Sequence, residues 1–555
     1  MFFCYNLFFF FFFFFFFFFF FFFFFFFFFF FFFFFFFFFF NSFSMSLIFF
    51  FDWISCFFMS FVFLISGCVL FYSLGYMSGD LNLIRFYFLV FLFILSMIFF
   101  ILMPDLICLL LGWDGLGLIS YCLVIYYQNI VSLSSGLITL LINRLGDVFL
   151  ILGVGIFFNF GSFHYIFYIN FFDNDFVLVI YFILFASFTK SAQFPFSFWL
   201  PAAMSAPTPV SSLVHSSTLV TSGLYLIIRF NYFIYFCDTY FLMIISLITM
   251  ILSGFAACVE NDLSKIIAYS TLSQLGFMFF TLSLGSLILC FVHLLIHAIF
   301  KSLLFLCSGF FIHCFFGNQD IRFMGGLVKQ CPYISSMIFV SLINLCGFPF
   351  FSGFYSSDFV LEMVFLFNYS FFFFFFFFFS FIYSFRLIYY LFFSYSHFFP
   401  YVNFSYSSYM NISLFFLYFF CLFGGSLLFW LFEDDYFFFL SFEFKIISFI
   451  FFIIYFFIFF NILSGLNFFL SFIFFNFFSS MWFLNYFSSK LFLGQFYFFS
   501  YSSYCLVDSG WLEYFISGSL VGFFSWLGSM IDNFTLNIFM CFFFFFFFFF
   551  FFFFF

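Results

Sequence analysis

The chain has 555 residues, of which 68% are hydrophobic and only 6% are charged, so the composition excludes a soluble globular protein. The net charge of −9 rests on few residues, several of them inside apolar stretches, and no basic patch suggests a nucleic-acid partner. The 15 cysteines contain no C-x-x-C pair, so neither a zinc site nor an iron–sulfur ligand set is indicated.

Apolar windows recur along almost the whole chain. A membrane-spanning helix needs about 20 mostly apolar residues, and this window length predicts roughly 13 to 16 spans. The sequence therefore predicts an all-α polytopic membrane protein, in which most surface positions face lipid or protein.

Phenylalanine accounts for 156 residues, including unbroken runs at 8–40 and 542–555. These runs have no periodicity, so packing does not explain them. Phe, Ile, Leu, Tyr and Asn have codons rich in thymine and adenine, and the composition indicates an AT-biased organelle genome. We expect the 8–40 run to form one span or two, or to be a translated T-tract outside the true gene. It lacks the basic flank and cleavage site of a signal peptide.

The stretch 182–229 is the most informative part of the chain. Between Lys190 and His215 it contains Pro195, Pro201, Pro207 and Pro209. Each proline removes a backbone donor and disfavours the helical conformation of the preceding residue, so the helix must break here. A broken helix at membrane depth requires protein or a water-filled cavity around its freed backbone groups. The sequence therefore predicts a hydrated interior path, faced by Lys190 and His215.

Other ionisable residues lie inside apolar stretches. Asp114 is near the middle of one, and Arg144 and Asp147 are three residues apart in the next, a spacing that places both on one helix face. Ionisable residues within spans are rare and commonly mark a proton or ion pathway. The alternatives are a satisfied structural carboxylate for Asp114, and simple mutual pairing for Arg144 and Asp147.

His293, His297 and Lys301 recur every four residues, which stacks them along one face of a helix. Histidine titrates near neutral pH and has two ring nitrogens, so it can pass a proton along a water chain. Each histidine alone would more often be a core residue. His215 also has hydroxyl neighbours that would satisfy it structurally.

A second interrupted helix is predicted at 342–362, where Gly347, Pro349 and Gly353 break an apolar run. Asp358 and Glu362 follow at helical spacing, and plain solvation at a helix edge is the alternative for both. Two interrupted hydrophobic helices in two halves point to a repeat-built transporter core. No dinucleotide-binding glycine motif, phosphate loop or nucleophile elbow occurs, so redox chemistry by this chain is unsupported.

Several motifs, in this order, closely resemble the chain 5 family of NADH-ubiquinone oxidoreductase, the distal antiporter-like proton-pumping subunits of respiratory complex I. They are GWDGLGLISYCLV, NRLGDVFLI, KSAQFPFSFWLPAAMSAPTPVSSLVHSSTLVTSG, NDLSKIIAYSTLSQLGFM, HLLIHAIFKSLLFLCSG, QDIRFMGGL and GFPFFSGFYSSD. The resemblance covers 72–362, with a weaker echo at 508–513.

The resemblance implies two inverted repeats with broken helices, a C-terminal lateral helix and an anchoring span. The expected division is 1–44, a Phe-rich segment with one or more spans; 45–130, N-terminal spans up to the Asp114 helix; 131–370, the antiporter-like core; 371–440, further spans; 441–510, a lateral-helix region; and 511–555, the anchoring span with its Phe tract.

By motif, the resemblance implies proton-transfer roles for nine residues, with no cofactor-binding or metal-binding residue among them. Asp114 takes the place of the carboxylate that partners Lys190, and Asp358 that of the acid in the second broken helix. The full set is Asp114, Arg144, Asp147, Lys190, His215, His293, His297, Lys301 and Asp358.

Three positions depart from the family pattern. Asp114 replaces a glutamate and is one methylene shorter, so its contact with Lys190 is expected to need a water. Ser205 replaces another glutamate. Ser357 replaces the lysine of the family's YSKD motif, thought to lie at the exit of the path, so either Arg386 or another group substitutes or the exit differs.

We therefore expect a multi-pass subunit of the mitochondrial inner membrane that translocates protons within respiratory complex I. NADH oxidation and ubiquinone reduction would occur in other subunits, which would hold the NADH, FMN, iron–sulfur clusters and ubiquinone. The expected partners are other membrane-arm subunits, especially the neighbouring antiporter-like subunit, and lipids. The alternatives are a monovalent cation/proton antiporter subunit and, favoured by Ser357, a purely structural membrane anchor.

Overall fold

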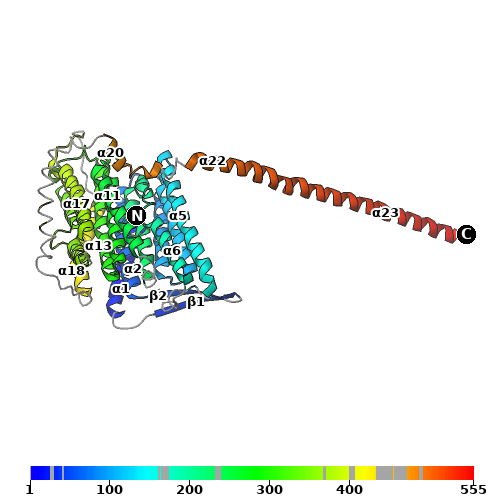
Figure 1. The fold of residues 1–555 in the computed structure, drawn as a ribbon, viewed down its shortest axis with the longest axis horizontal. Helices are drawn as coiled ribbons and strands as arrows, with labels where there is room; N and C mark the ends of the chain where they lie inside the picture. Colours follow the sequence, from blue (N-terminus) through cyan, green and yellow to red (C-terminus); the bar gives the residue numbers. More distant parts are fainter. Residues whose placement is uncertain are drawn as a thin grey trace. The chain divides into compact units, whose positions relative to one another are not determined.

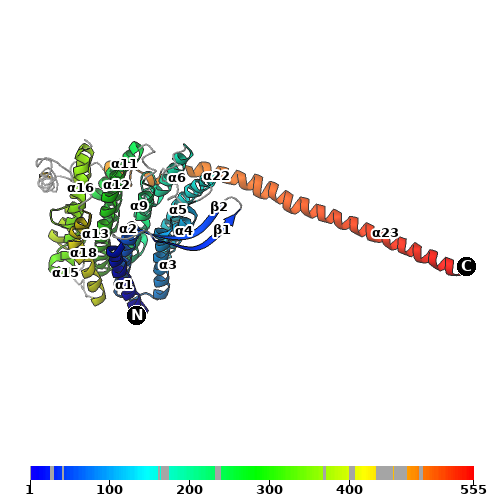
Figure 2. The same cartoon turned by 90° about the horizontal axis from the view of Figure 1, so that it is seen from below.

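The computed structural model describes residues 2–25, 31–40, 43–160, 163, 174–231, 239–366, 370–398, 407–432, 450, 454, 472–486 and 492–554. The chain separates into two compact units, 1–482 and 483–555, each of which is described by itself. The first unit is a bundle of helices (Figures 1 and 2). The all-α class predicted from composition is confirmed.

The Phe-rich segment adopts two kinds of structure. Helix α1 (Phe2–Phe25) packs along α2 (Trp53–Tyr76), whereas β1 (Phe31–Phe40) and β2 (Phe43–Phe51) form an antiparallel pair, drawn in blue in Figure 2. For the 8–40 run we expected one span, two spans or a translated T-tract outside the true gene, and the strand pair at 31–51 is none of the helical arrangements among these. A homopolymer has no hydrophobic period to favour one element, and phenylalanine is well accommodated in strands.

Helices α2 to α6 follow one another in the chain, and each packs against the next. Asp52 caps α2 through the backbone N–H of Ser55, whose hydroxyl accepts from the Asp52 N–H in return. The bounds are α3 (Leu83–Leu102), α4 (Leu106–Val124), α5 (Ile130–Phe157), the 3-10 turn η1 (Phe158–Phe160) and α6 (Asn174–Lys190).

The chain breaks at the predicted prolines. Helix α6 ends at Lys190, and the short elements α7 (Trp199–Ala202) and η3 (Ala203–Ser205) precede α8 (Thr208–Val214). A second interruption at 215–218 separates α8 from α9 (Leu219–Arg229). The other predicted break is also present, because α15 (Pro332–Cys346) ends at Gly347, which has φ of 70°, and α16 (Ser352–Leu366) begins five residues later.

Helix α13 (Leu287–Cys314) is the centre of the first unit. It packs against α2, α8, α12, α15, α16 and α18, and nearly all of its side chains are buried. The other helices of this half are α11 (Thr239–Val259), α12 (Leu263–Ser283), α14 (Leu327–Gln330), α17 (Ser370–Ile388), the π-helical η4 (Tyr389–Phe393), α18 (Ser408–Phe432) and α20 (Phe472–Ser479).

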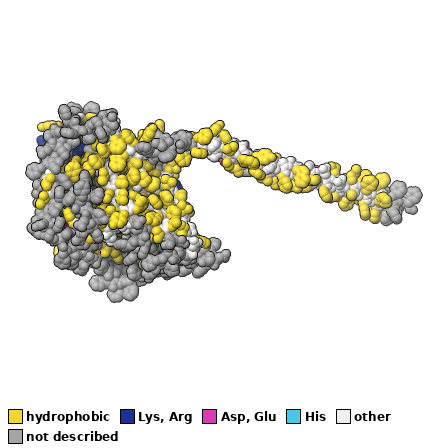
Figure 3. Space-filling model, viewed as in Figure 1, with side chains coloured by type: hydrophobic (Ala, Val, Ile, Leu, Met, Phe, Trp, Pro, Cys, Tyr) yellow, Lys and Arg dark blue, Asp and Glu magenta, His cyan; other side chains and the backbone are white. Residues whose placement is uncertain are grey.

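Ten helices within the described ranges are long and apolar enough to cross a membrane, and four shorter apolar helices accompany them. The shorter ones include α15 and most of α6, which are the pieces of interrupted helices. Hydrophobic side chains cover most of the described surface in the view of Figure 3, including the area over α5 and α6. This surface is suited to contact with lipid or with other membrane proteins.

The second unit is mainly one long helical stretch, 492–554. It consists of α22 (Phe492–Ser503), the π-helical segments η8 (Tyr504–Leu512) and η9 (Tyr514–Ser519), and α23 (Leu520–Phe554), after the short α21 (Leu484–Tyr486). Of the predicted lateral-helix region 441–510, residues 441–449, 451–453, 455–471 and 487–491 lie outside the described residues.

Candidate functional site

Four charged residues form what we call the charge cluster: Asp114 on α4, Arg144 and Asp147 on α5, and Lys190 at the end of α6. Arg144 Nη1 lies 3.0 Å from Asp147 Oδ2 and 3.8 Å from Asp114 Oδ2. The Trp113 Nε1–H donates to Asp147 Oδ1 at 2.9 Å. Arg144 and Asp147 thus share one face of α5, as predicted. Asp114 and Trp113 of α4 contact them there.

Lys190 is fully buried, and its ammonium donates to the Trp113 carbonyl at 2.5 Å. It also lies 3.9 Å from the centre of the Trp113 ring, a cation–π contact. The carboxylates of Asp147 and Asp114 are both close enough to act on it electrostatically. Within the described residues, Lys190 and Asp114 form no direct ion pair, and Asp114 pairs with Arg144. The water-mediated contact expected between Lys190 and Asp114 stays a prediction.

A glycine permits this arrangement. A side chain at Gly146 would place its Cβ 2.2 Å from Thr189 Oγ1, so only glycine lets α5 approach the end of α6 so closely. Gly146 lies between Arg144 and Asp147 in sequence and Thr189 precedes Lys190. The close helix crossing therefore brings the Arg144–Asp147 pair toward the lysine.

The charge cluster is open on one side. The Asp114 and Arg144 side chains are 40% and 44% exposed, whereas Asp147 is 8% exposed and Lys190 is fully buried. Charges exposed within an apolar span are costly in lipid. This side is thus suited to a protein neighbour or to water.

The broken region behind Lys190 forms hydrogen bonds within the protein, through a backbone carbonyl and a side chain. The Trp199 Nε1–H donates to the Thr189 carbonyl at 2.9 Å, and Thr249 Oγ1 donates to Gln193 Oε1 at 2.8 Å. Freed carbonyls at a helix end need such partners when they are buried.

His215 directly follows α8, at the second interruption. Both ring nitrogens are buried without a hydrogen-bond partner among the described residues. The neighbouring hydroxyls bind backbone carbonyls instead: Ser217 and Thr218 donate to Leu213, and Ser216 donates to Ser212. The hydroxyls that were the structural alternative therefore do not satisfy the imidazole.

His293, His297 and Lys301 form the α13 polar face, as their spacing predicts. His293 Nε2 lies 3.1 Å from Gln274 Oε1 on α12, and Lys301 Nζ donates to Ser270 Oγ on the same helix at 2.5 Å. His293 Nδ1 lies 2.8 Å from Ser356 Oγ on α16. This face therefore links α13 to the second broken helix through neutral partners.

His297, between the other two, is fully buried, and its two ring nitrogens have no hydrogen-bond partner within the described chain. Buried polar groups in proteins are normally satisfied by protein or by ordered water. An imidazole in this position is suited to bind water and to exchange a proton with it.

The second broken helix holds the remaining predicted residues. Asp358 lies on α16, half-buried, two residues after the serine that contacts His293. Ser357 donates to the Phe354 carbonyl at 3.4 Å. The Arg386 guanidinium donates to the carbonyls of Cys258 and Glu260 at the end of α11, and its substitution for the missing lysine stays a prediction.

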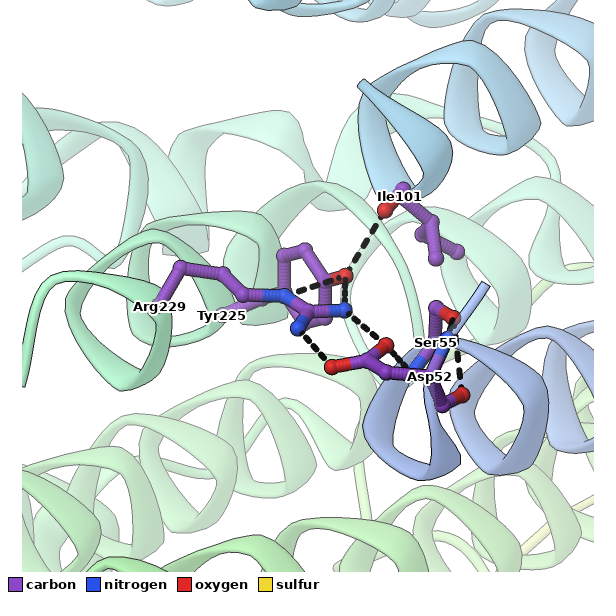
Figure 4. A network of polar contacts seen from close by, with 5 residues as sticks. All are labelled: Asp52, Ser55, Ile101, Tyr225 and Arg229. Atoms are coloured by element: carbon purple, nitrogen blue, oxygen red, sulfur yellow. Dashed lines mark hydrogen bonds and ion pairs between the residues drawn. The ribbon is translucent and has the colours of Figure 1, made fainter. Parts of the chain in front are cut away.

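Sequence reasoning missed a buried ion pair between Asp52 and Arg229 (Figure 4). Both side chains are 7% exposed, and Arg229 also donates to Tyr225 Oη, which in turn donates to the Ile101 carbonyl. The network joins the start of α2, the end of α3 and the end of α9. The Asp-x-x-Ser capping pattern at 52–55 was the available sequence signal.

Comparison with known proteins places these observations in a family. The model described as "NADH:quinone oxidoreductase/Mrp antiporter, TM" matches residues 103–383. The chain 5 N-terminus model of complex I matches 37–87, and the NADH dehydrogenase subunit 5 C-terminus model matches 383–555.

Curated relatives carry the same name. NADH-ubiquinone oxidoreductase chain 5 of Aedes aegypti is 54% identical over 269 residues, which is 48% of this chain and 46% of that protein. The Anopheles arabiensis chain 5 is also 54% identical over 269 residues, 48% of this chain and 70% of that protein. The chain thus spans about half the length of most of these curated relatives that it matches.

Among solved structures, the Mrp complex from Dietzia sp. DQ12-45-1b is similar, with a TM-score of 0.68 at 23% identity. The match covers 77% of this chain and 50% of that one, and it supports the fold. From the three family-model matches and the identity to curated relatives, the chain belongs to the NADH-ubiquinone oxidoreductase chain 5 family.

Proposed function

We propose that this chain is a proton-translocating membrane subunit of respiratory complex I. One observation carries the proposal: a fully buried lysine, Lys190, ends a broken helix beside two carboxylates and a guanidinium inside an apolar bundle. Such a group is expensive to bury and has value where a proton must be taken up and released. The family and its curated relatives support this reading.

In the proposed mechanism, a conformational or electrostatic change in neighbouring subunits alters the distances between Lys190 and the carboxylates of Asp114 and Asp147. Proton affinity of a buried lysine depends on nearby charge, so this change makes Lys190 take up or release its proton. Arg144, which contacts both carboxylates, couples their positions.

Onward transfer is proposed by way of His215 and the α13 polar face. In support, His215 and His297 have buried ring nitrogens without partners in the described chain, and α8 packs against α13. His293 then contacts α16, where Asp358 lies. No lysine is assigned to the exit of the proton path, because Ser357 occupies the position of the family's lysine.

The open side of the charge cluster supports a membrane-protein partner. Exposed apolar side chains of α4 and α5 surround Asp114 and Arg144, namely Leu111, Leu118, Leu137, Leu141, Leu145 and Val148. A neighbouring antiporter-like subunit would cover this apolar surface and shield both charges from lipid. We propose such a subunit as the partner here.

The redox reaction is assigned to other subunits of the complex, which would hold NADH, FMN, iron–sulfur clusters and ubiquinone. As an enzyme, the chain would then act as part of a proton-translocating NADH:ubiquinone reductase. The ten candidate spans among its described residues and its family support a membrane location, and the animal relatives and the AT-biased composition support the mitochondrial inner membrane.

Purification of the tagged chain in mild detergent tests the assignment. A very large NADH-oxidising assembly is expected, in which NADH drives proton uptake into reconstituted vesicles. Recovery of a small complex that exchanges monovalent cations for protons without NADH would instead support the antiporter alternative, which the family description and the Mrp-like fold also accommodate. Normal pumping by a Lys190→Met variant would favour the structural-anchor alternative.

A further inference from the structure

Asn143 is a buried side chain to which neither the family motifs nor the proposed mechanism assigns a role. It lies on α5, directly before Arg144, and is 3% exposed. Within the described residues, neither its Nδ2 nor its Oδ1 has a hydrogen-bond partner. An amide offers two donor hydrogens and two acceptor positions, so this is a large unsatisfied polar group.

Its position relates it to the charge cluster. A Cβ built on Gly117 of α4 would lie 3.6 Å from Asn143 Cβ and 3.9 Å from Nδ2, so the amide lies against this glycine. Gly117 is three residues after Asp114, which places the two on one face of α4. Three successive pairs face each other along the antiparallel helices α4 and α5. Trp113 donates to Asp147, Asp114 pairs with Arg144, and Gly117 lies against Asn143.

Asp114 shows the complementary feature. Its Oδ2 faces Arg144, whereas its Oδ1 is buried and has no partner in the part of the chain that the structure describes. Two buried, unpartnered polar groups therefore lie about one helical turn apart on the same helix pair. Gly117 leaves room beside them, because it carries no side chain.

Burying an amide and a carboxylate oxygen without partners is costly, and ordered water with two to four polar contacts is the common solution. We propose that Asn143 binds a water that bridges its amide to Asp114 Oδ1, and that this water extends the proton path from the charge cluster toward the open side of α4 and α5. Asn143 is thus a positioning residue, which acts through water on Asp114.

This inference rests on the proposed function, and three variants of the assembled complex test it. Asn143→Leu keeps a similar volume but removes both polar atoms, whereas Asn143→Ser retains a hydroxyl for water. Thr139→Val is the matched control one turn earlier, because the Thr139 hydroxyl is buried but already donates to the Gly136 carbonyl.

We expect Asn143→Leu to lower the proton-to-electron ratio and to change the solvent isotope effect on proton uptake, whereas Asn143→Ser and Thr139→Val stay near wild type. Wild-type pumping by Asn143→Leu would overturn the inference, as would equal losses in Asn143→Leu and Thr139→Val. Lys190→Met, measured in parallel, separates the two proposals: if it alone lowers pumping, only the water site fails.

If the Asn143→Leu complex does not assemble, a density map of the wild-type complex still tests the proposed water site. A density map that resolves ordered water should show one within hydrogen-bond distance of both Asn143 and Asp114. A map that resolves neighbouring waters but none at this position would overturn the proposal.

Discussion

The charge cluster and the α13 polar face are both buried in apolar helices, but their partners differ. Lys190 lies among two carboxylates and a guanidinium, and one side of its cluster is open. Lys301 is equally buried but donates to a serine hydroxyl, while His293 contacts an amide and a serine.

The difference in partners favours a different role for each region in the proposed proton path. Opposite charges can be separated or brought together, so the charge cluster is suited to respond to an external signal. A face with neutral partners changes little electrostatically, but it can pass a proton between imidazoles, hydroxyls and water. In the proposed mechanism, the charge cluster is the control element and the α13 polar face is the conducting element.

Removing the charge from the first region should have the largest effect. For Lys190→Met we expect proton uptake through this chain to fall by about 10²-fold or more, as for loss of an acid–base group. NADH-driven proton uptake in reconstituted vesicles measures it. The control is Lys265→Met, which removes a 40%-exposed lysine paired with Asp262. An unchanged proton-to-electron ratio in Lys190→Met would contradict the assigned role.

The lysine of the second region should matter less. For Lys301→Ala, with assembly verified, we expect a loss on the order of tenfold, below the range for a direct acid–base group, because imidazoles and hydroxyls still line the face. Lys329→Ala, at an exposed position of the short helix α14, is the matched control. If Lys301→Ala lowers proton uptake as much as Lys190→Met does, the distinction between the two regions is wrong.

Substitutions of the two histidines of the α13 polar face should affect proton uptake and thermal stability differently. His297→Leu removes nitrogens without protein partners, so proton uptake should fall while the melting temperature holds. His293→Leu removes the hydrogen bonds to Gln274 Oε1 and Ser356 Oγ, at a cost of about 1–3 kcal/mol. Thermal melting of the assembled complex, measured with proton uptake, checks both. A larger stability loss in His297→Leu would reverse the assignment.

Breaking the buried ion pair between Asp52 and Arg229 should lower stability more than breaking an exposed ion pair. Removing one partner of a buried pair costs about 3–5 kcal/mol, so Asp52→Asn should lower the melting temperature clearly. Arg322→Gln is the control, since it breaks an exposed pair with Asp320 worth about 0–1 kcal/mol. Because α9 packs against α6, Asp52→Asn should also disturb Lys190. Equal stability losses in the two variants would refute this.

The smallest effect concerns the loop after α13. Hydrogen bonds from Arg322 hold the pKa of the Asp320 carboxyl below its ordinary value of 3.8. A lowered folded-state pKa adds stability that is present above 3.8 and is lost as the pH falls through the folded-state value. The stability difference between wild type and Arg322→Gln should therefore vanish in acid, as followed by unfolding in detergent. A difference that grows in acid would contradict the sign.

The sequence by itself determined the elements that local chemistry dictates. Length and hydropathy predicted the membrane helices, the prolines predicted the break after Lys190, and Gly347 with Pro349 predicted the second break. The four-residue spacing predicted the shared face of His293, His297 and Lys301. These features depend on helix periodicity and on backbone donors, which can be read from neighbouring residues alone.

Tertiary structure decided how these pieces pair. It placed Asp114 against Arg144 instead of Lys190, and it joined Asp52 to Arg229 across 177 residues. It also decided which parts of the Phe-rich segment became helix and which became strand. The physical reason is that a buried charge selects its partner by the distance between packed helices, and a close crossing such as that at Gly146 has no signature in local periodicity.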